Sequence, residues 1–281
     1  MLGSLIIVFR EVIEAGLIVG IVLAVTQGVP RRGLWVAGGV AAGLFGAAMV
    51  AVFAGALADA FSGIGQEMFN AGILALAVVM LAWHNIWMAT HGREMAANLR
   101  GVGLAVAEGA KTLTALAIVV AVAVLREGSE VVLFLYGIAA AGAADFGSLL
   151  FGGLCGLALG GVLSALMFYG LVKVPARRLF AVTTTLITFL AAGMAAQCVV
   201  FLQQAGLATA FSNTLWDTSW LLPDDSVIGR VMHVLFGYVD QPSGMQALVY
   251  VLTLAGIIIA TRLASGAPAM TKKTAEASAA G

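Results

Sequence analysis

The sequence predicts an all-α protein that crosses a membrane several times. Of its 281 residues, 62% are hydrophobic and only 10% are charged, whereas soluble domains carry about 25% charged residues. Apolar stretches of roughly 20 residues, long enough to cross the hydrocarbon core of a bilayer, recur along the whole chain. Because these stretches are continuous rather than alternating, they favour membrane-spanning helices over spanning strands.

The apolar stretches predict seven spanning helices. We expect them at residues 2–26, 34–57, 67–89, 112–141, 148–172, 179–205 and 244–262. Most connections are short and contain glycine, proline or charged residues, but 90–111 and 206–243 are longer. Within the connection 206–243, residues 227–238 predict a short amphipathic helix that lies on the outer surface. The tail 263–281 is rich in Ala, Ser, Lys and Thr and is predicted to be disordered.

The basic residues predict the orientation of these helices. Cytoplasmic loops of membrane proteins carry an excess of Lys and Arg, and eleven of the fourteen basic residues fall on one side of the seven-helix arrangement: Arg31, Arg32, Arg93, Arg100, Lys111, Lys173, Arg177, Arg178, Arg262, Lys272 and Lys273. The loops of the other side hold only Arg230. We therefore expect a multi-pass protein of the cytoplasmic (inner) membrane, with its N-terminus outside and its C-terminus in the cytoplasm.

A repeated motif divides the chain into two halves. The segment 8–14 (Val-Phe-Arg-Glu-Val-Ile-Glu) matches 124–130 (Val-Leu-Arg-Glu-Gly-Ser-Glu), and Arg10 and Arg126 are 116 residues apart. Since three helices make up this interval, the two copies enter the membrane from opposite sides. The transmembrane domain 1–262 would then contain repeat 1 (about 1–89), an inverted repeat 2 (about 112–205), an outer loop (206–243) and a seventh helix (244–262). Secondary transporters often bind their substrate at such a repeat interface, near the middle of the membrane.

The two Arg-Glu-x-x-Glu motifs place six ionisable residues inside apolar helices. At roughly 2.5–3.5 kcal/mol each near a helix centre, their insertion would cost about 15–20 kcal/mol before pairing. Both motifs lie some 15–20 Å from the helix end by which their helix enters the membrane, at about 1.5 Å per residue. They can therefore meet near the middle of the bilayer, where so costly an arrangement favours a functional role.

The spacing within each motif indicates which charges pair. Residues i and i+4 share a helix face, so Arg10 can pair with Glu14 and Arg126 with Glu130. Glu11 and Glu127 remain free to face a partner. Four carboxylates and two guanidiniums leave an excess negative charge that a metal ion would neutralise, and ligation by oxygen alone suits hard cations such as Fe³⁺, Mn²⁺, Mg²⁺ or Ca²⁺.

Two other interpretations of the motifs stay open. The charges could form a buried ion-pair lock that fixes the register of two helices, although buried salt bridges often add little stability. They could also form a proton relay without a metal.

Other polar residues are candidates for an ion pathway. His84 falls on one helix stripe with Met80, Met88 and His91, although a histidine in a membrane helix often makes only an interhelical hydrogen bond. Gln197 could line the path or bond to another helix. Asp217, Asp224 and Asp225 of the outer loop could concentrate cations at its mouth, or could simply be solvated.

At these residues the chain resembles a known family, the oxidase-dependent iron permeases of fungi and bacteria, and especially the bacterial Efe-type permease. Paired Arg-Glu-x-x-Glu motifs in the first and fourth helices carry the resemblance, and it covers nearly the whole chain except the tail. Further similar stretches are 81–88 (Leu-Ala-Trp-His-Asn-Ile-Trp-Met), 195–197, 201–204, 216–222, 237–238 and 241–243.

The resemblance implies iron import, with Glu11, Glu14, Glu127 and Glu130 as the iron-binding carboxylates and Arg10 and Arg126 supporting them. It also implies an extracytoplasmic partner protein that oxidises or delivers iron. Iron is then the transported substrate, and no permanently bound cofactor is expected. Some members have an acidic cluster near the outer face, but here Glu67 is followed three positions later by Asn70, which puts that outer site in doubt.

Three rival functions follow from the same residues. The chain could transport another divalent cation or a small cationic solute on the same scaffold. An intramembrane enzyme would need a nucleophile with a base, or a metal motif such as His-Glu-x-x-His, and the sequence shows neither. Ser129, inside the second motif, is the one hydroxyl group that stands out as a candidate nucleophile. A passive docking subunit would leave the charges inside the membrane unexplained. We therefore predict a permease without enzymatic activity.

Overall fold

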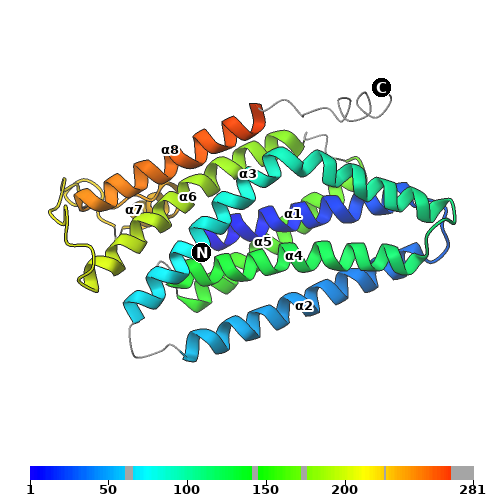
Figure 1. The fold of residues 1–281 in the computed structure, drawn as a ribbon, viewed down its shortest axis with the longest axis horizontal. Helices are drawn as coiled ribbons and strands as arrows, with labels where there is room; N and C mark the ends of the chain where they lie inside the picture. The colour runs from blue at the N-terminus through cyan, green and yellow to red at the C-terminus, as the bar shows by residue number, and fades with distance from the viewer. Residues whose placement is uncertain (61–65, 141–144, 172–175, 225, 267–281) are drawn as a thin grey trace, which may run out of the picture.

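A computed structural model describes residues 1–60, 66–140, 145–171, 176–224 and 226–266. These residues are almost entirely helical, as the sequence predicts, apart from loops and one isolated β-bridge between Thr214 and Ser243. The helices in chain order are α1 (Leu2–Val25), α2 (Arg32–Ala60), α3 (Gln66–Ala107), α4 (Leu113–Ala140), α5 (Phe146–Phe168), α6 (Ala176–Gln204), α7 (Val227–Phe236) and α8 (Gly244–Gly266). Figure 1 shows the long helices running in the same general direction as one elongated bundle.

The long helices have the length and composition of membrane spans. Five contain a segment that is long and apolar enough to cross a bilayer: Arg32–Ala56, Glu67–Gly92, Phe146–Phe168, Phe180–Gln204 and Gly244–Ala264. Helices α1 and α4 are 24 and 28 residues long, but each carries one complete Arg-Glu-x-x-Glu motif. The protein is therefore a multi-pass membrane protein in which α1 and α4 each hold one copy of the repeated motif.

Helix α3 corrects one predicted boundary. Residues 90–111 were expected to form a connection, yet α3 continues to Ala107 and has 42 residues, about 63 Å at 1.5 Å per residue. Figure 1 shows it rising from the lower left and then bending along the top of the bundle. Hydropathy marks where an apolar segment ends rather than where a helix ends, and the polar stretch after Thr90 is rich in strong helix formers such as Ala, Leu, Met and Arg.

Glycine rows bring two pairs of helices together. A Cβ at Gly156 of α5 would lie 2.6 Å from the backbone oxygen of Leu5 in α1, and a Cβ at Gly43 of α2 would lie 2.7 Å from the backbone oxygen of Ala121 in α4. Because only glycine fits at these distances, α5 lies directly against α1, and α2 against α4. Figure 1 shows the second pair at the lower edge of the bundle.

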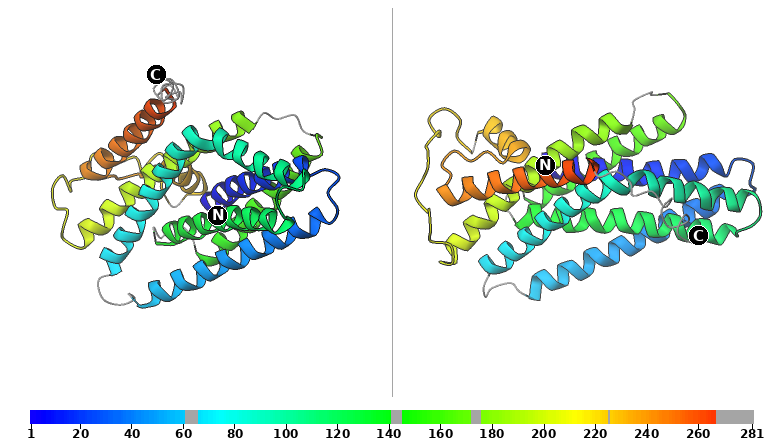
Figure 2. Two further views of the ribbon diagram at one scale, coloured as in Figure 1. Left: turned by 45° about the vertical axis from the view of Figure 1, so that its right-hand side comes forward. Right: turned by 45° about the horizontal axis from the view of Figure 1, so that its top comes forward.

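An apolar cluster fills the part of the bundle on one side of the motifs. Its fully buried members include Ile7, Leu74, Leu81, Phe134 and Ile187, from α1, α3, α4 and α6. Ile7 precedes Glu11 by one turn, Leu81 precedes His84 by about one turn and Phe134 follows Glu130 by one turn, so these members lie on the side of the motifs toward the N-terminus of α1. The view on the right of Figure 2 shows the first residue of the chain within the bundle, beside these helices.

Helix α7 forms where the amphipathic pattern predicts a helix, but it is not confined to the end of the bundle. Its C-terminal glycine, Gly237, has φ 68°, and a Cβ at Gly193 of α6 would lie 2.9 Å from the Cα of Gly237. Gly193 lies about 16 Å before the C-terminal end of α6. The rings of Phe236 and Phe189 also meet edge to face, with centroids 5.3 Å apart. The loop therefore turns back along α6 instead of lying flat on the outer surface.

Candidate metal centre

Four ionisable side chains from three helices converge inside the bundle. Glu11 of α1, His84 of α3, and Glu127 and Glu130 of α4 each offer one ligand atom, and these atoms all lie within 4.8 Å of one another. Glu11, His84 and Glu127 are buried, and Glu130 is mostly so. The two repeated motifs, which are far apart in the sequence, thus meet at one point, as predicted, and a histidine joins them.

The arginines pair within their own motifs, as the helical spacing predicts. Arg10 Nε donates a hydrogen bond to Glu14 Oε1 at 2.8 Å, and Arg126 Nε donates to Glu130 Oε1 at 3.2 Å. Arg10 Nη1 also lies 3.8 Å from Glu11 Oε1. Each guanidinium thus lies beside a carboxyl group of its own motif, which gives its buried charge a partner.

His84 lies between the two motifs. Its Nε2 is 3.4 Å from Glu14 Oε2 in α1, and its Nδ1 contacts Glu130 Oε2 in α4. The next residue, Asn85, donates a hydrogen bond of 3.5 Å from Nδ2 to Thr188 Oγ1 in α6. The sequence singled out His84 only as a possible pathway residue, because nothing in the order of residues says which helix lies beside α1 and α4.

The carboxylates of Glu11 and Glu127 are the least satisfied groups of the cluster. Within the described part of the chain, no neighbouring N–H or hydroxyl group donates a hydrogen bond to either carboxyl group, although all four oxygens are buried and the two groups lie within hydrogen-bonding reach of each other. Buried carboxylates are normally hydrogen-bonded, paired or bound to a cation. Their arrangement therefore suits a positively charged ligand.

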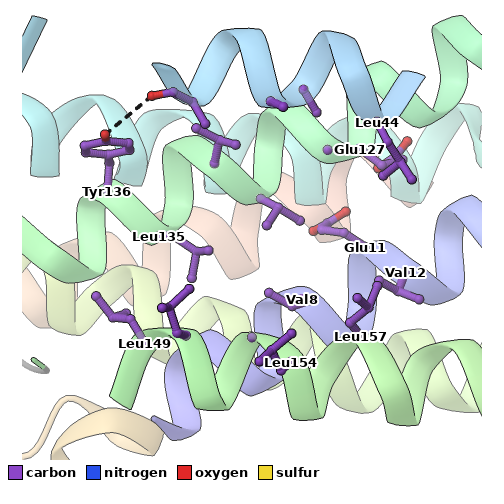
Figure 3. A pocket seen from close by; sticks show the side chains of 18 of the residues that line it. Val8, Glu11, Val12, Leu44, Glu127, Leu135, Tyr136, Leu149, Leu154 and Leu157 are labelled. Carbon is purple, nitrogen blue, oxygen red and sulfur yellow. Dashed lines mark hydrogen bonds between the residues drawn. The ribbon is translucent and has the colours of Figure 1, made fainter. Parts of the chain in front are cut away.

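An apolar cavity of about 610 Å³ adjoins these two glutamates. Figure 3 shows it between α1, α2, α4 and α5, with Glu11 at its wall and Tyr136 donating a hydrogen bond of 3.5 Å to the backbone oxygen of Ala51. Its lining consists mostly of Val, Leu, Ala and Gly side chains. Such a lining disfavours a hydrated ion, so the cavity is a poor candidate for an ion site.

The two motifs differ in their exposure. The side chain of Arg10 is 2% exposed, whereas that of Arg126 is 34% exposed and that of its partner Glu130 is 12% exposed. The guanidinium carbon of Arg126 lies 4.1 Å from the ring centroid of Trp87, and Arg126 Nη1 lies 4.0 Å from Met95 Sδ. This cation–π contact, which joins α4 to α3, was not predicted from the sequence. The cluster is thus most accessible beside Arg126.

The remaining predicted pathway residues do not join the cluster. Glu67 is exposed in the first turn of α3, about 25 Å along that helix from His84. Gln197 is half-buried in α6, beyond Thr188 in the direction of the C-terminal end of that helix.

The acidic residues of the loop 206–243 order the loop itself. Asp217 accepts hydrogen bonds from the hydroxyl group and the backbone N–H of Ser219, which lower its pKa. Asp224 and Asp240 each accept a backbone N–H from the other at 3.2 Å. Burial and the charge of Asp240 raise the pKa of Asp224. The predicted residue Asp225 lies outside the described residues.

The fold and the cluster together define the class of this protein. A multi-pass bundle that buries carboxylates between its helices is typical of membrane transporters, because ionisable residues inside a membrane mark ion and substrate pathways.

Comparison with known proteins identifies the family. Residues 1–271 match the family described as "Iron permease FTR1 family". The chain is 31% identical over 274 residues to the ferrous iron permease EfeU of Shigella sonnei (strain Ss046), covering 96% of this chain and 98% of that protein. It is 32% identical over 259 residues to the ferrous iron permease EfeU of Escherichia coli O6:K15:H31 (strain 536 / UPEC), covering 90% and 92%. No solved structure matches the chain significantly. The chain belongs to the FTR1 family of iron permeases, and the predicted resemblance is confirmed.

Proposed function

We propose that this protein imports iron across the cytoplasmic membrane and that the ion passes through the site formed by the two motifs, with Glu11, Glu14, Glu127 and Glu130 as its carboxylates. The observation that carries the proposal is the convergence of Glu11, His84, Glu127 and Glu130 within 4.8 Å inside the bundle. The names of the relatives describe ferrous iron permeases, so Fe²⁺ is the ion to test first.

The charge of the site supports a cationic substrate. With His84 neutral and all four carboxyl groups ionised, the site carries two more negative than positive charges, and no neighbouring N–H or hydroxyl group donates to Glu11 or Glu127 within the described residues. A divalent ion would neutralise this excess. The structural lock considered from the sequence is less favourable, since an ion-pair lock would give both carboxylates a close cationic partner. Within the described residues, Glu11 has only Arg10 Nη1 at 3.8 Å and Glu127 forms no ion pair.

We further propose seven spans arranged as two inverted repeats of three helices and a seventh helix, with the N-terminus outside. In this arrangement α1, α2 and α3 form the first repeat, α4, α5 and α6 the second, and α8 is the seventh span. The glycine contacts support it: Gly43 faces Ala121 and Gly156 faces Leu5, and Leu5 and Ala121 are 116 residues apart, like the two motifs. The first helix of each proposed repeat thus packs in the same way against the second helix of the other repeat.

The exposure of the site suggests how transport proceeds. Toward the N-terminus of α1, the site is covered by the apolar residues Ile7, Leu74, Leu81 and Phe134, whereas Arg126 on α4 is partly exposed. With the N-terminus outside, this conformation is closed to the outside, and iron can enter only after these helices separate. Rocking of the two repeats would then expose the site first to the outside and later to the cytoplasm.

Iron would reach the site from a partner protein outside the membrane that oxidises or delivers it. Glu67 and the acidic residues Asp217, Asp224 and Asp225 lie on the side that we take to be outer, where negative charge concentrates cations. Two of them already serve the loop: Asp217 holds Ser219 and Asp224 holds Asp240. Their part in uptake is therefore electrostatic attraction and not tight binding.

Uptake of radioactive iron into proteoliposomes tests the proposal. We expect Glu11→Gln and Glu127→Gln each to reduce uptake by about tenfold or more, because removing even an indirect support of a metal ligand typically costs 10–100-fold. Glu108→Gln, at an exposed carboxylate just after α3 and far from the cluster, is the matched control and should retain most uptake. Undiminished uptake by both cluster variants would refute the site. Efficient competition by lysine or another cationic solute would refute iron as the substrate.

A further inference from the structure

We propose that His84 is a metal ligand and that Glu14 is not, so that the ion is held by three carboxylates and one imidazole, from Glu11, Glu127, Glu130 and His84. This inference rests on the proposed function, since it describes the ion site of the same permease. It changes the expected chemistry of that site from oxygen ligands alone to mixed nitrogen and oxygen ligands.

The position of the His84 ring supports a direct role. The side chain is buried and belongs to the group of four whose ligand atoms lie within 4.8 Å of one another. Its Nδ1 faces Glu130, one of the carboxylates of that group, and so points to where the other ligand atoms converge. The neighbouring Asn85, which hydrogen-bonds to Thr188 of α6, helps to hold this part of α3 in place.

The contacts of Glu14 indicate a supporting role. Its Oε1 accepts the hydrogen bond of Arg10 at 2.8 Å, and its Oε2 faces His84 Nε2 at 3.4 Å. The two oxygens of Glu14 thus face Arg10 and the Nε2 side of the His84 ring, whereas Glu130 faces the Nδ1 side of that ring. A metal-binding histidine usually donates its other ring N–H to a carboxylate, which fixes the orientation of the ring. Glu14 is suitably placed for this task, and Arg10 in turn orients Glu14.

The proposed ligands predict which ions the site prefers. Mg²⁺ and Ca²⁺ are bound almost entirely by oxygen atoms, whereas imidazole suits iron, zinc, nickel and copper. One imidazole among three carboxylates therefore favours divalent transition metals over Mg²⁺ and Ca²⁺, which the sequence alone would have admitted. Such a preference matters for an iron importer, because it must reject the alkaline-earth cations.

Pulsed electron paramagnetic resonance can detect the nitrogen ligand directly. Mn²⁺ would be added as the probe to full-length protein purified in detergent with a histidine-free affinity tag, and the ¹⁴N modulation of its signal measured. The chain has three histidines, namely His84, His91 and His233. We expect ¹⁴N modulation in the unaltered protein and in the control His91→Gln, which changes an exposed histidine of the same helix, but not in His84→Gln.

A second pair of variants separates ligands from supporting residues. Glu14→Gln should retain the ¹⁴N modulation and weaken Mn²⁺ affinity by about 10–100-fold, the usual effect of losing a supporting carboxylate, while Glu130→Gln should weaken it further. His84→Asp should bind Mn²⁺ without ¹⁴N modulation and should lose it to Mg²⁺ at lower concentrations than the unaltered protein does.

Each result is decisive for a different claim. Bound Mn²⁺ without ¹⁴N modulation in the unaltered protein, or unchanged modulation in His84→Gln, would overturn the role of His84. Equal loss of affinity in Glu14→Gln and Glu130→Gln would make Glu14 a ligand. If Mn²⁺ does not bind to the unaltered protein at all, the ion site of the proposed function fails, and this inference fails with it.

Discussion

The two arginines of the repeated motif have the same partners in sequence but different surroundings. Arg10 is 2% exposed and lies near both glutamates of its motif. Arg126 is 34% exposed, bonds to Glu130 and lies over the ring of Trp87. Removing one member of a fully buried ion pair leaves the other charge buried without compensation, whereas a partly exposed pair is screened by water. The two motifs should therefore respond differently to the same substitution.

We accordingly expect Arg10→Gln to destabilise the protein more than Arg126→Gln does. The loss of the buried pair should cost about 3–5 kcal/mol, and that of the more exposed pair about 1 kcal/mol or less. Thermal unfolding of the purified proteins in detergent, together with their amounts in membranes, measures the difference. Arg10→Lys keeps the charge and should recover part of the stability. Equal losses from the two Gln variants would contradict this account of the motifs.

At the scale of the helices, two rows of glycine fix how closely the motif-bearing helices approach their neighbours. Gly156 lets α5 touch the backbone of α1, and Gly43 lets α2 touch the backbone of α4. In lipid, such close contact replaces the hydrophobic effect as the source of helix association. Other glycines of the same helices, Gly38 and Gly161, have no atom within 4 Å of an added Cβ. They provide matched controls.

Gly156→Ala and Gly43→Ala should each lower the thermal stability of the protein. An added Cβ would meet a backbone oxygen at 2.6 Å or 2.7 Å, and forced overpacking typically costs about 1–3 kcal/mol. Gly161→Ala and Gly38→Ala should leave stability unchanged or slightly raised, because alanine favours a helix by about 1 kcal/mol relative to glycine. The apparent unfolding temperature in detergent is the measurement. If the control variants lose as much stability as the test variants, the close helix contacts are not what holds these pairs together.

At the scale of the whole molecule, orientation decides what the asymmetric exposure of the site means. With the N-terminus outside, the apolar cluster around Leu81 and Phe134 closes the outer side, and Arg126 lies on the cytoplasmic side of the site. Among the described residues, five helices qualify as spans by length and composition. The proposed arrangement adds α1 and α4, which carry the motifs, and its odd number of spans would leave the two chain ends on opposite sides of the membrane.

Reporter fusions test this orientation. A fluorescent protein that matures only in the cytoplasm should be bright when fused after Gly281 and dark when fused after Gly206, at the end of α6. Alkaline phosphatase, which is active only outside the cytoplasmic membrane, should give the opposite pattern at the same two positions. Phosphatase activity at the C-terminus would contradict seven spans and would also reverse the assignment of the outer and inner sides of the site.

The sequence by itself determined the features that depend on local spacing or on the solvent around a helix. The apolar segments predicted the helices to within a few residues, except at the end of α3, because lipid requires long apolar helices. The i, i+4 spacing predicted the pairs Arg10–Glu14 and Arg126–Glu130, both of which the structure confirms, because a single helix fixes its own side-chain spacing.

Only the tertiary structure decided which side chains share the site. The motifs alone nominated all four glutamates as ligands, yet the bundle brings Glu11, Glu127 and Glu130 together with His84 and leaves Glu14 beside them. It also joins Arg126 to Trp87. The physical reason is that the position and rotation of α3 relative to α1 and α4 come from the contacts of whole helix surfaces, including residues far apart in the sequence. No spacing along a single helix contains that information.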